Sequence, residues 1–259
     1  MLTTVGFFIA RAHGESDARH DSSHRAEIAA TRVRDRVAQA ATLVDGVRRF
    51  LASPDSSGAT TAQFADIGER WLIPVGLPAA AWVERVPAAE RTSYERRTGH
   101  HIVVLTSSGG LARAGPRMTY LPATLVTRNP PMSAPGIDLG GSSGVADAVA
   151  RPQTAFRVSA TPLRQLADGT TGVFLVQSGQ RLDRGAVEPG FVVLFLPSSW
   201  LLAGAADTGG SNPRAKITVG GVSAGDRGDA ATARSTRSST MAPFTTSAPS
   251  ADRTAAVLA

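Results

Sequence analysis

The chain has 259 residues, 42% of them hydrophobic and 19% charged, so it is long enough to bury one large domain or two small ones. Its formal net charge is +6, and the basic residues, mostly arginine, are mixed with acidic ones rather than gathered into a stripe with aromatic residues. This pattern argues against nucleic acid as a partner. The absence of cysteine excludes a disulfide framework and cysteine-ligated zinc.

The first apolar stretch covers residues 2–10 and is followed by Arg11. It is too short to span a membrane, which needs about 20 apolar residues. It also lacks the basic segment that opens a secretory signal. Two interpretations remain: a buried strand or helix turn, or the last half of a transmembrane helix that begins upstream. Because a long polar helix follows directly, we expect residues 1–12 to be the remnant of a transmembrane segment.

Residues 15–53 are predicted to form one long helix. Apolar residues recur there at alternating spacings of four and three: Ala26, Ala30, Val33, Val37, Ala40, Val44, Val47 and Leu51. Such a seam is typical of a helix that pairs with a second helix, so we expect a homodimer through it. The alternative is a helix packed on its own domain, because Leu43 and Phe50 widen the apolar face. The two arrangements are compatible, because one face of the helix can pack on its own domain and another on a partner helix.

Residues 60–205 have the pattern of a mixed domain of helices and strands. Helices are predicted over residues 61–72, 87–98 and 143–150. Strands rich in valine, phenylalanine and leucine are predicted over residues 102–106, 118–126, 172–177 and 191–196. The composition changes after Ala205: residues 206–229 contain a turn-rich linker and one further strand over residues 215–220. Residues 230–259 are poor in apolar side chains and are predicted to be a disordered tail.

A glycine-rich segment, Gly140-Gly141-Ser142-Ser143-Gly144, matches the nucleophile elbow of serine hydrolases. That chemistry needs a histidine after the serine in chain order, and every histidine lies at or before His101. The favoured interpretation is a turn whose Ser142 or Ser143 caps the next helix, with a serine hydrolase as the least favoured alternative.

Two histidines, His20 and His24, lie four residues apart, which is a spacing that can place both on one metal. No third strong ligand is evident in the sequence. We therefore expect no metal site, no cofactor and no enzymatic activity.

Four sequence blocks resemble, in the same order, the conserved blocks of CHASE domains. The first is Trp82-Val83-Glu84-Arg85-Val86-Pro87-Ala88-Ala89-Glu90-Arg91 with Tyr94-Glu95, and the others are Arg117–Pro122, Gly136–Leu139 and Ser159–Leu163. The resemblance covers residues 48–202. It departs from the family at residues 173–179, where a pocket wall differs, and after residue 220, where further strands and a second transmembrane helix are missing.

This resemblance implies an α+β fold, with the long N-terminal helix followed by a PAS-like antiparallel sheet domain with flanking helices. It implies a small-molecule pocket in the subdomain over residues 60–205 and the start of an incomplete membrane-proximal subdomain over residues 206–229. It also implies a location outside the cell membrane, in a membrane-anchored receptor of a bacterial signal-transduction system, of which this chain is a truncated or frame-shifted part.

The ligand contact with the strongest support from the resemblance is Asp138, because the aspartate of the matching turn binds ring nitrogens in the related plant receptors. Tyr120 and Phe174 are expected as flat apolar walls, Met118 on the same strand as Tyr120, and the backbone around Ser159 as an edge contact. The function predicted is therefore an extracytoplasmic sensor of an unknown small molecule. The main alternative is a dimerisation or structural module that binds no ligand.

Overall fold

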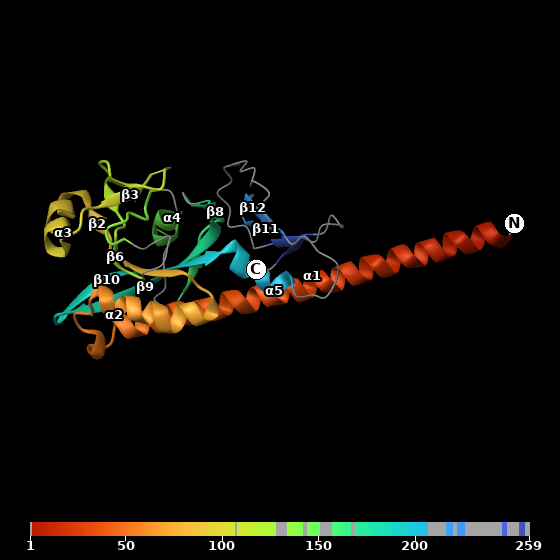
Figure 1. Ribbon diagram of the computed structural model, residues 1–259, viewed down its shortest axis with the longest axis horizontal. Coiled ribbons are helices and arrows are strands. Elements are labelled where there is room, and N and C mark those ends of the chain that lie inside the picture. The colour runs from red at the N-terminus through yellow and green to blue at the C-terminus, as the bar shows by residue number, and fades with distance from the viewer. Residues whose placement is uncertain are drawn as a thin grey trace. The chain divides into compact units, whose positions relative to one another are not determined.

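The computed structural model describes residues 2–106, 108–127, 134–141, 144–150, 157–166, 169–206, 216–219, 222–225, 245–247 and 254–256. The chain divides into two compact units. One unit comprises residues 38–200, and the other comprises residues 1–37 and 201–259. The predicted α+β class is confirmed, with a long N-terminal helix followed by an antiparallel sheet (Figure 1).

The predicted long helix is α1, which spans Leu2–Leu51 and so begins earlier than the sequence pattern indicates. It ends where Pro54 opens a short 3-10 turn, Pro54–Ser56. The hydroxyl of Ser56 donates a 2.6 Å hydrogen bond to the carbonyl of Phe50, which satisfies one of the free carbonyl groups at the helix end. Among the helices that the structure describes, none is long and apolar enough to cross a membrane.

The main sheet is antiparallel, with strand order β6-β1-β10-β9-β7, and β8 also pairs with β9. Its strands are β1 (Ala79–Val83), β6 (Ala123–Val126), β7 (Ser159–Ala160), β8 (Arg164–Gln165), β9 (Thr171–Asp183) and β10 (Ala186–Pro197). A tight turn at Arg184 and Gly185, both with positive φ, joins β9 to β10. These two strands extend well beyond the predicted residues 172–177 and 191–196.

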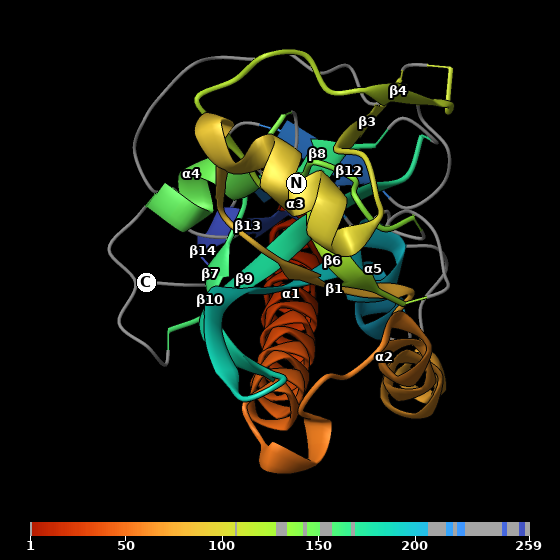
Figure 2. The same cartoon turned by 90° about the vertical axis from the view of Figure 1, so that its left-hand side faces the viewer.

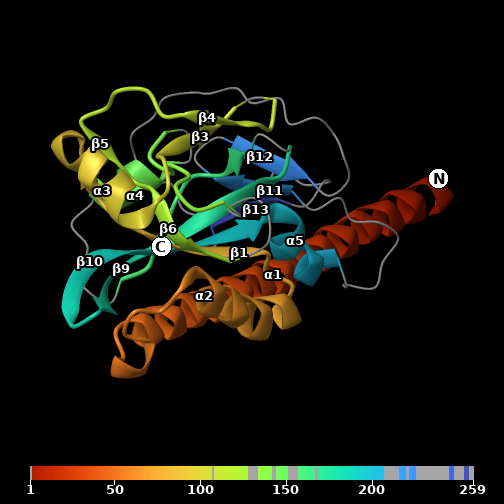
Figure 3. The same ribbon diagram turned by 60° about the vertical axis from the view of Figure 1, so that its left-hand side comes forward.

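Helices cover both faces of this sheet (Figure 2, Figure 3). On one face, α4 (Val145–Ala150) packs over alternate residues of the three central strands, including Val83, Phe174 and Phe195. On the other face lie the last turns of α1 and α2 (Thr61–Ile67), the latter continued by a π-helical turn, Gly68–Leu72. A sheet buried on both faces accounts for the nearly continuous apolar runs of β1, β9 and β10.

The apolar seam of α1 is used, at its C-terminal end, inside its own unit. Ala40, Val44, Val47 and Leu51 are all buried within the single chain. Asp45 accepts a 3.5 Å hydrogen bond from the side-chain amide of Gln177 on β9. The alternative in which this helix packs on its own domain is therefore confirmed for these turns, while pairing with a second chain stays a prediction.

The indole of Trp82 is fully buried between the sheet and α1 because two glycines face it. Gly179 and Gly190 are cross-strand partners on β9 and β10. A Cβ atom on Gly190 would lie 2.4 Å from the Trp82 ring and 2.7 Å from the carbonyl oxygen of Val83. At Gly179 a Cβ atom would meet the side chain of Arg48, which covers the indole from α1. The absence of side chains at these two positions makes room for the largest residue of the core.

A smaller layer lies beyond the edge of the main sheet. It consists of α3 (Arg91–Thr98), preceded by a 3-10 turn at Ala88–Glu90, and two ribbons. The ribbons pair β2 (Val86–Pro87) with β5 (Thr119–Tyr120), and β3 (Val103–Leu105) with β4 (Leu111–Arg113). Tyr94, Ile102 and Tyr120 form its apolar centre.

One strand prediction was wrong in this layer. Residues 118–126 do not form a single strand, because β5 pairs with β2 and β6 pairs with β1 in a different sheet. The break falls at Leu121 and Pro122. Pro122 has no N–H, and the N–H of Leu121 donates to a side chain instead of a neighbouring strand.

The second unit contains a four-stranded sheet with order β12-β11-β13-β14. These strands are β11 (Lys216–Val219), β12 (Val222–Gly225), β13 (Thr245–Ser247) and β14 (Thr254–Ala256), and α5 spans Ser198–Ala206. The strand predicted over residues 215–220 corresponds to β11. Apart from β13 and β14, the tail predicted to be disordered lies outside the described residues, so that prediction stays a prediction.

The close approach of Trp82 to Gly190 gives a test of this packing. Gly190→Ala should reduce the free energy of unfolding by about 1–3 kcal/mol or more, because the methyl group must displace a fully buried indole. Gly115→Ala is the matched control, since a Cβ atom there meets nothing within 4 Å. Urea unfolding followed by tryptophan fluorescence measures both; equal stability of the two variants would contradict the packing described.

Candidate functional site

Asp138 was predicted to contact a ligand, and the structure places it inside the fold. Its side chain is 0% exposed. One carboxylate oxygen, Oδ1, accepts hydrogen bonds from the backbone N–H of Leu121 at 2.8 Å and of Gly140 at 3.0 Å. The other, Oδ2, lies 3.5 Å from a guanidinium nitrogen of Arg117. Asp138 therefore ties the start of the glycine-rich segment to the break between β5 and β6.

Tyr120 is also engaged within the protein. Its hydroxyl accepts hydrogen bonds from the backbone N–H of Arg117 at 3.0 Å and from Arg91 at 3.2 Å. It donates one to the carbonyl of Gly115 at 3.1 Å. The guanidinium of Arg91 lies 5.0 Å from the centre of its ring, in cation–π contact. The ring face that was predicted to receive a ligand is thus occupied by Arg91.

The remaining predicted site residues do not gather around one cavity. Phe174 packs against Phe195 in the main core, with ring centroids 5.1 Å apart. Met118 is 88% exposed on a loop, and Ser159 is half-buried on β7 opposite Val176. Tyr120 and Phe174 belong to separate apolar clusters. Side chains fill the space on the Phe174 side of the sheet, namely Leu121, Ile137, Leu139, Val145 and Ala148.

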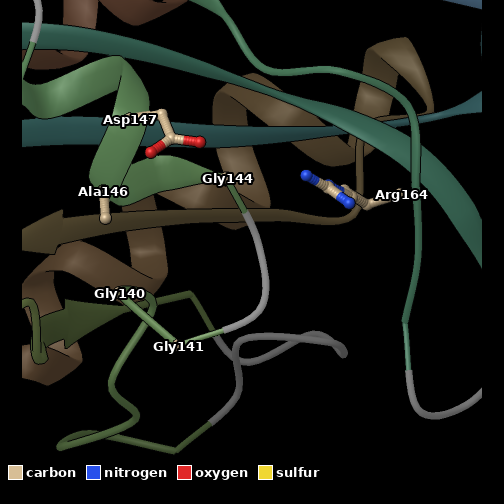
Figure 4. Close-up of a pocket in the computed structure, with 6 residues that line it drawn as sticks. All are labelled: Gly140, Gly141, Gly144, Ala146, Asp147 and Arg164. Carbon is tan, nitrogen blue, oxygen red and sulfur yellow. The ribbon is translucent and has the colours of Figure 1, made fainter. Parts of the chain in front are cut away.

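A cleft of about 320 Å³ lies beside Asp138, on the glycine-rich segment that this carboxylate holds. It is lined by Gly140, Gly141, Gly144, Ala146, Asp147 and Arg164 (Figure 4). The glycines come from the loop before α4, Ala146 and Asp147 from α4 itself, and Arg164 from β8. The loop, the helix that directly follows it and the later strand β8 thus converge on one cleft.

The walls of the cleft carry opposite charges. Figure 4 shows the side chains of Asp147 and Arg164 pointing toward one another from opposite sides. Asp147 is exposed on the first turn of α4. The Nε–H of Arg164 is buried and has no hydrogen-bond acceptor within the described part of the chain. A buried N–H donor without an acceptor is costly, and an anionic group bound beside the guanidinium would offset that cost.

Arg117 adds a second guanidinium behind the same loop. Its Nη2 atom lies 2.9 Å from the place where a Cβ atom on Gly141 would be. The guanidinium, which is also paired with Asp138, therefore lies close against the loop backbone at Gly141. The loop is therefore held by a charge pair on one side and faces the open cleft on the other.

A second carboxylate, Glu95 on α3, ties the neighbouring ribbon to the helix. Its Oε1 accepts hydrogen bonds from the N–H of Ile102 at 3.1 Å and from Arg91 at 3.0 Å. His101 and Arg113 approach its Oε2 at 3.1 and 3.3 Å. Burial alone would raise the pKa of this carboxyl, but these bonds outweigh it and lower the pKa to about 2. Glu95 is thus a structural anion at all ordinary pH values.

Sequence reasoning found the loop but missed the two charged residues of the cleft. Gly140, Gly141 and Gly144 were recognised as a turn before a helix, whereas Asp147 and Arg164 belong to no motif. Ser142 and Ser143, on which the hydrolase alternative depends, lie outside the described residues. Within the part of the chain that the structure describes, no group of three or more His, Cys, Asp or Glu side chains is arranged to hold a metal ion.

The structural role of Asp138 can be tested without a ligand. Asp138→Ala should lower the free energy of unfolding by about 2–4 kcal/mol, because two backbone N–H groups lose their acceptor. Asp138→Asn keeps an acceptor oxygen and should cost less than half as much. Asp66→Ala, at an exposed position of α2, serves as control. If Asp138→Ala proved as stable as the control in urea unfolding, the carboxylate would not hold the loop.

No family model matches the sequence, and no curated protein matches it. The resemblance to CHASE domains therefore stays a prediction. Solved structures that are similar in fold include the ligand-binding domain of the Pseudomonas fluorescens chemoreceptor CtaA in complex with L-valine. It is 12% identical, with a TM-score of 0.44, over 79% of this chain and 72% of that chain.

Another is the sensory domain of the Campylobacter jejuni chemoreceptor Tlp3 with isoleucine bound, 10% identical, with a TM-score of 0.43, over 78% of this chain and 67% of that chain. A further structure of the Tlp3 ligand-binding domain, in complex with L-valine, has a TM-score of 0.43 at 11% identity, over 78% of this chain and 68% of that chain. Solved structures that resemble this chain are thus sensory domains of chemoreceptors.

Proposed function

We propose that this chain is the extracytoplasmic small-molecule-sensing domain of a membrane-anchored receptor, and that its ligand binds in the cleft between the Gly140–Gly144 loop and Arg164. The observation that carries the proposal is the pair of opposite charges, Asp147 and Arg164, that face one another across an unfilled hollow (Figure 4). The volume of about 320 Å³ is at the lower end of the range for small-molecule sites.

The charge arrangement favours a small zwitterion as the ligand. Arg164 offers a planar guanidinium, which binds carboxylates in two parallel hydrogen bonds. Asp147 offers an acceptor for an ammonium group on the opposite wall. Glycines at positions 140, 141 and 144 let a ligand approach the backbone closely. A free amino acid carries both required charges.

The sheet offers a route from this cleft to the long helix. α4, which carries Asp147, packs against β9. On its opposite face β9 presents Gln177 to Asp45, and Gly179 to Arg48, both on α1. A ligand that draws α4 toward Arg164 would therefore displace β9 through the contacts on one face of the strand. The other face of β9 contacts α1, so the displacement would reach that helix. Pairing of two chains through α1 and anchoring in the membrane complete the proposed receptor.

The alternative, a structural or dimerisation module without a ligand, has one observation in its favour. The space expected to hold a ligand beside Phe174 is filled by core side chains. This alternative makes no use of the Arg164 N–H that lacks an acceptor, so a ligand screen separates the two functions.

The test is a thermal-shift screen of the purified chain with the proteinogenic amino acids, followed by calorimetry on any that bind. Arg164→Gln and Asp147→Asn should each weaken binding by about 10-fold or more, because each removes a charge-assisted hydrogen bond worth about 1.5–3 kcal/mol. Both variants should keep the unfolding temperature of the ligand-free protein, since neither side chain supports the core.

Arg96→Gln and Asp66→Asn, at exposed positions on α3 and α2, are matched controls that should bind as the wild type does. If both cleft variants kept the wild-type affinity, the ligand would bind elsewhere. If no compound stabilised the chain and the chain formed a stable dimer in sedimentation experiments, the structural alternative would replace the sensor.

A further inference from the structure

Five charged side chains meet where the far end of the β9–β10 hairpin approaches α3 and the end of β1. Arg97 of α3 forms ion pairs with Glu84 and, at 3.3 Å, with Glu188 of β10. Arg181 of β9 lies 3.3 Å from the same Glu188 and 2.7 Å from Asp183. The two guanidiniums and three carboxylates thus form one chain of ion pairs. It lies apart from the residues that line the cleft.

The charges in this cluster do not balance. With all five groups ionised the net charge is −1, and the two glutamates share Arg97 as a partner. Solvent screens the inner part of the cluster least, because the side chains of Glu84 and Arg181 are 9% and 5% exposed. The side chain of Glu188 is 25% exposed and that of Arg97 is 45% exposed. One excess negative charge in a poorly hydrated place is unfavourable, and the uptake of one proton removes it.

Several polar atoms of the cluster also lack hydrogen-bond partners among the described residues. They include two acceptors, Oε1 of Glu84 and Oε2 of Glu188, of which the second lies 3.3 Å from Nη2 of Arg181 in an ion pair without forming a hydrogen bond. A carboxyl group that gains a proton becomes a donor, which gives such a site a hydrogen bond that the fully ionised state cannot make. The geometry, like the charge count, favours a protonated form.

We propose that the Glu84–Glu188 pair, held between Arg97 and Arg181, is a proton-binding site that tightens the hairpin against α3 when the surroundings become acidic. This proton-binding site is separate from the cleft, so the proposal does not depend on whether the cleft binds a ligand. The hairpin reaches the segment after α1, where the N–H of Gly58 donates a 3.3 Å hydrogen bond to the carbonyl of Leu182. A tighter hairpin should therefore also stabilise the segment that follows the end of α1.

The surroundings of Glu188 shift its pKa in the direction that the proposal requires. Burial raises its pKa above the usual value, and the neighbouring charge of Glu84 raises it further, while Arg181 and Arg97 act in the opposite sense. A carboxyl whose pKa is raised by folding binds protons more readily in the folded than in the unfolded state. Its contribution to stability is therefore present at low pH and is lost as the pH rises through the folded-state pKa.

The other groups packed against the pair do not cancel this response. Burial alone would lower the pKa of Arg97, but its hydrogen bond and ion pair with Glu84 outweigh burial and raise the pKa, so its guanidinium stays charged. Tyr94 of α3, which packs beside Arg97, has its pKa raised by burial to about 12 and stays neutral. Asp183 is occupied by Arg181 at 2.7 Å. Glu188 is thus the carboxyl of the cluster whose surroundings favour the uptake of a proton.

The experiment is a pH titration of the side-chain carboxyl resonances by carbon-13 NMR, on the full chain. Glu188 should titrate above the usual range for a glutamate, and its midpoint should fall in Glu84→Gln, which removes the like charge. The protection factor of the Gly58 amide, which is the exchange rate corrected for its intrinsic dependence on pH, should be higher at pH 5 than at pH 7 in the wild type. It should lose that difference in Glu188→Gln.

Unfolding measurements give an independent reading. The stability of the wild type relative to Glu188→Gln should increase as the pH falls from 7 to 5, because the glutamine side chain at position 188 cannot take up a proton. Glu90→Gln, at an exposed position before α3, should follow the pH profile of the wild type. The proposal is overturned if Glu188 titrates in the usual range, or if the wild type and Glu188→Gln keep a constant difference in stability across this pH range.

Discussion

The sheet made by β1, β9 and β10 has both faces covered, and this constraint shapes the first compact unit. Because neither face can be left to water, one must be closed by α1 and α2 and the other by α4 and the loop before it. Trp82 illustrates how strictly the space is filled: its indole fits only because Gly179 and Gly190 lack side chains. A buried sheet of this kind transmits a displacement on one face to the other, since close-packed interiors deform little.

The cleft lies at the edge of that packing rather than inside it, and this position explains its chemistry. The core beside Phe174 is full, so the described residues that can face a ligand belong to the loop and to the helix and strand ends: Gly140, Gly141, Gly144, Asp147 and Arg164. Asp138 and Arg117 hold the loop from behind. Binding groups on loops supported by a rigid scaffold are the usual arrangement in proteins that recognise small molecules.

Most of the architecture could be predicted from periodicity, whereas the site could not. The α1 seam and the cores of β9 and β10 follow from spacing and valine-rich runs, but β1 was missed because Ala79-Ala80-Ala81 has low strand propensity and becomes a strand only through its two neighbours. Asp138 was assigned to a ligand because of its resemblance to the aspartate of a CHASE turn, and the sequence does not show that two backbone N–H groups donate to it. Asp147 and Arg164 meet only through the fold, so no motif could join them.

The central claim is that a small zwitterion binds between the glycine-rich loop and Arg164, and that its binding changes the contacts between β9 and α1. The most direct measurement is a map of backbone amide chemical shifts during titration with the tightest-binding amino acid. The account predicts that the largest changes fall on Gly140, Gly141, Gly144 and the neighbours of Arg164, followed by smaller ones at Gln177 and Asp45. Changes confined to the surroundings of Tyr120 and Met118, with none in the loop, would contradict it.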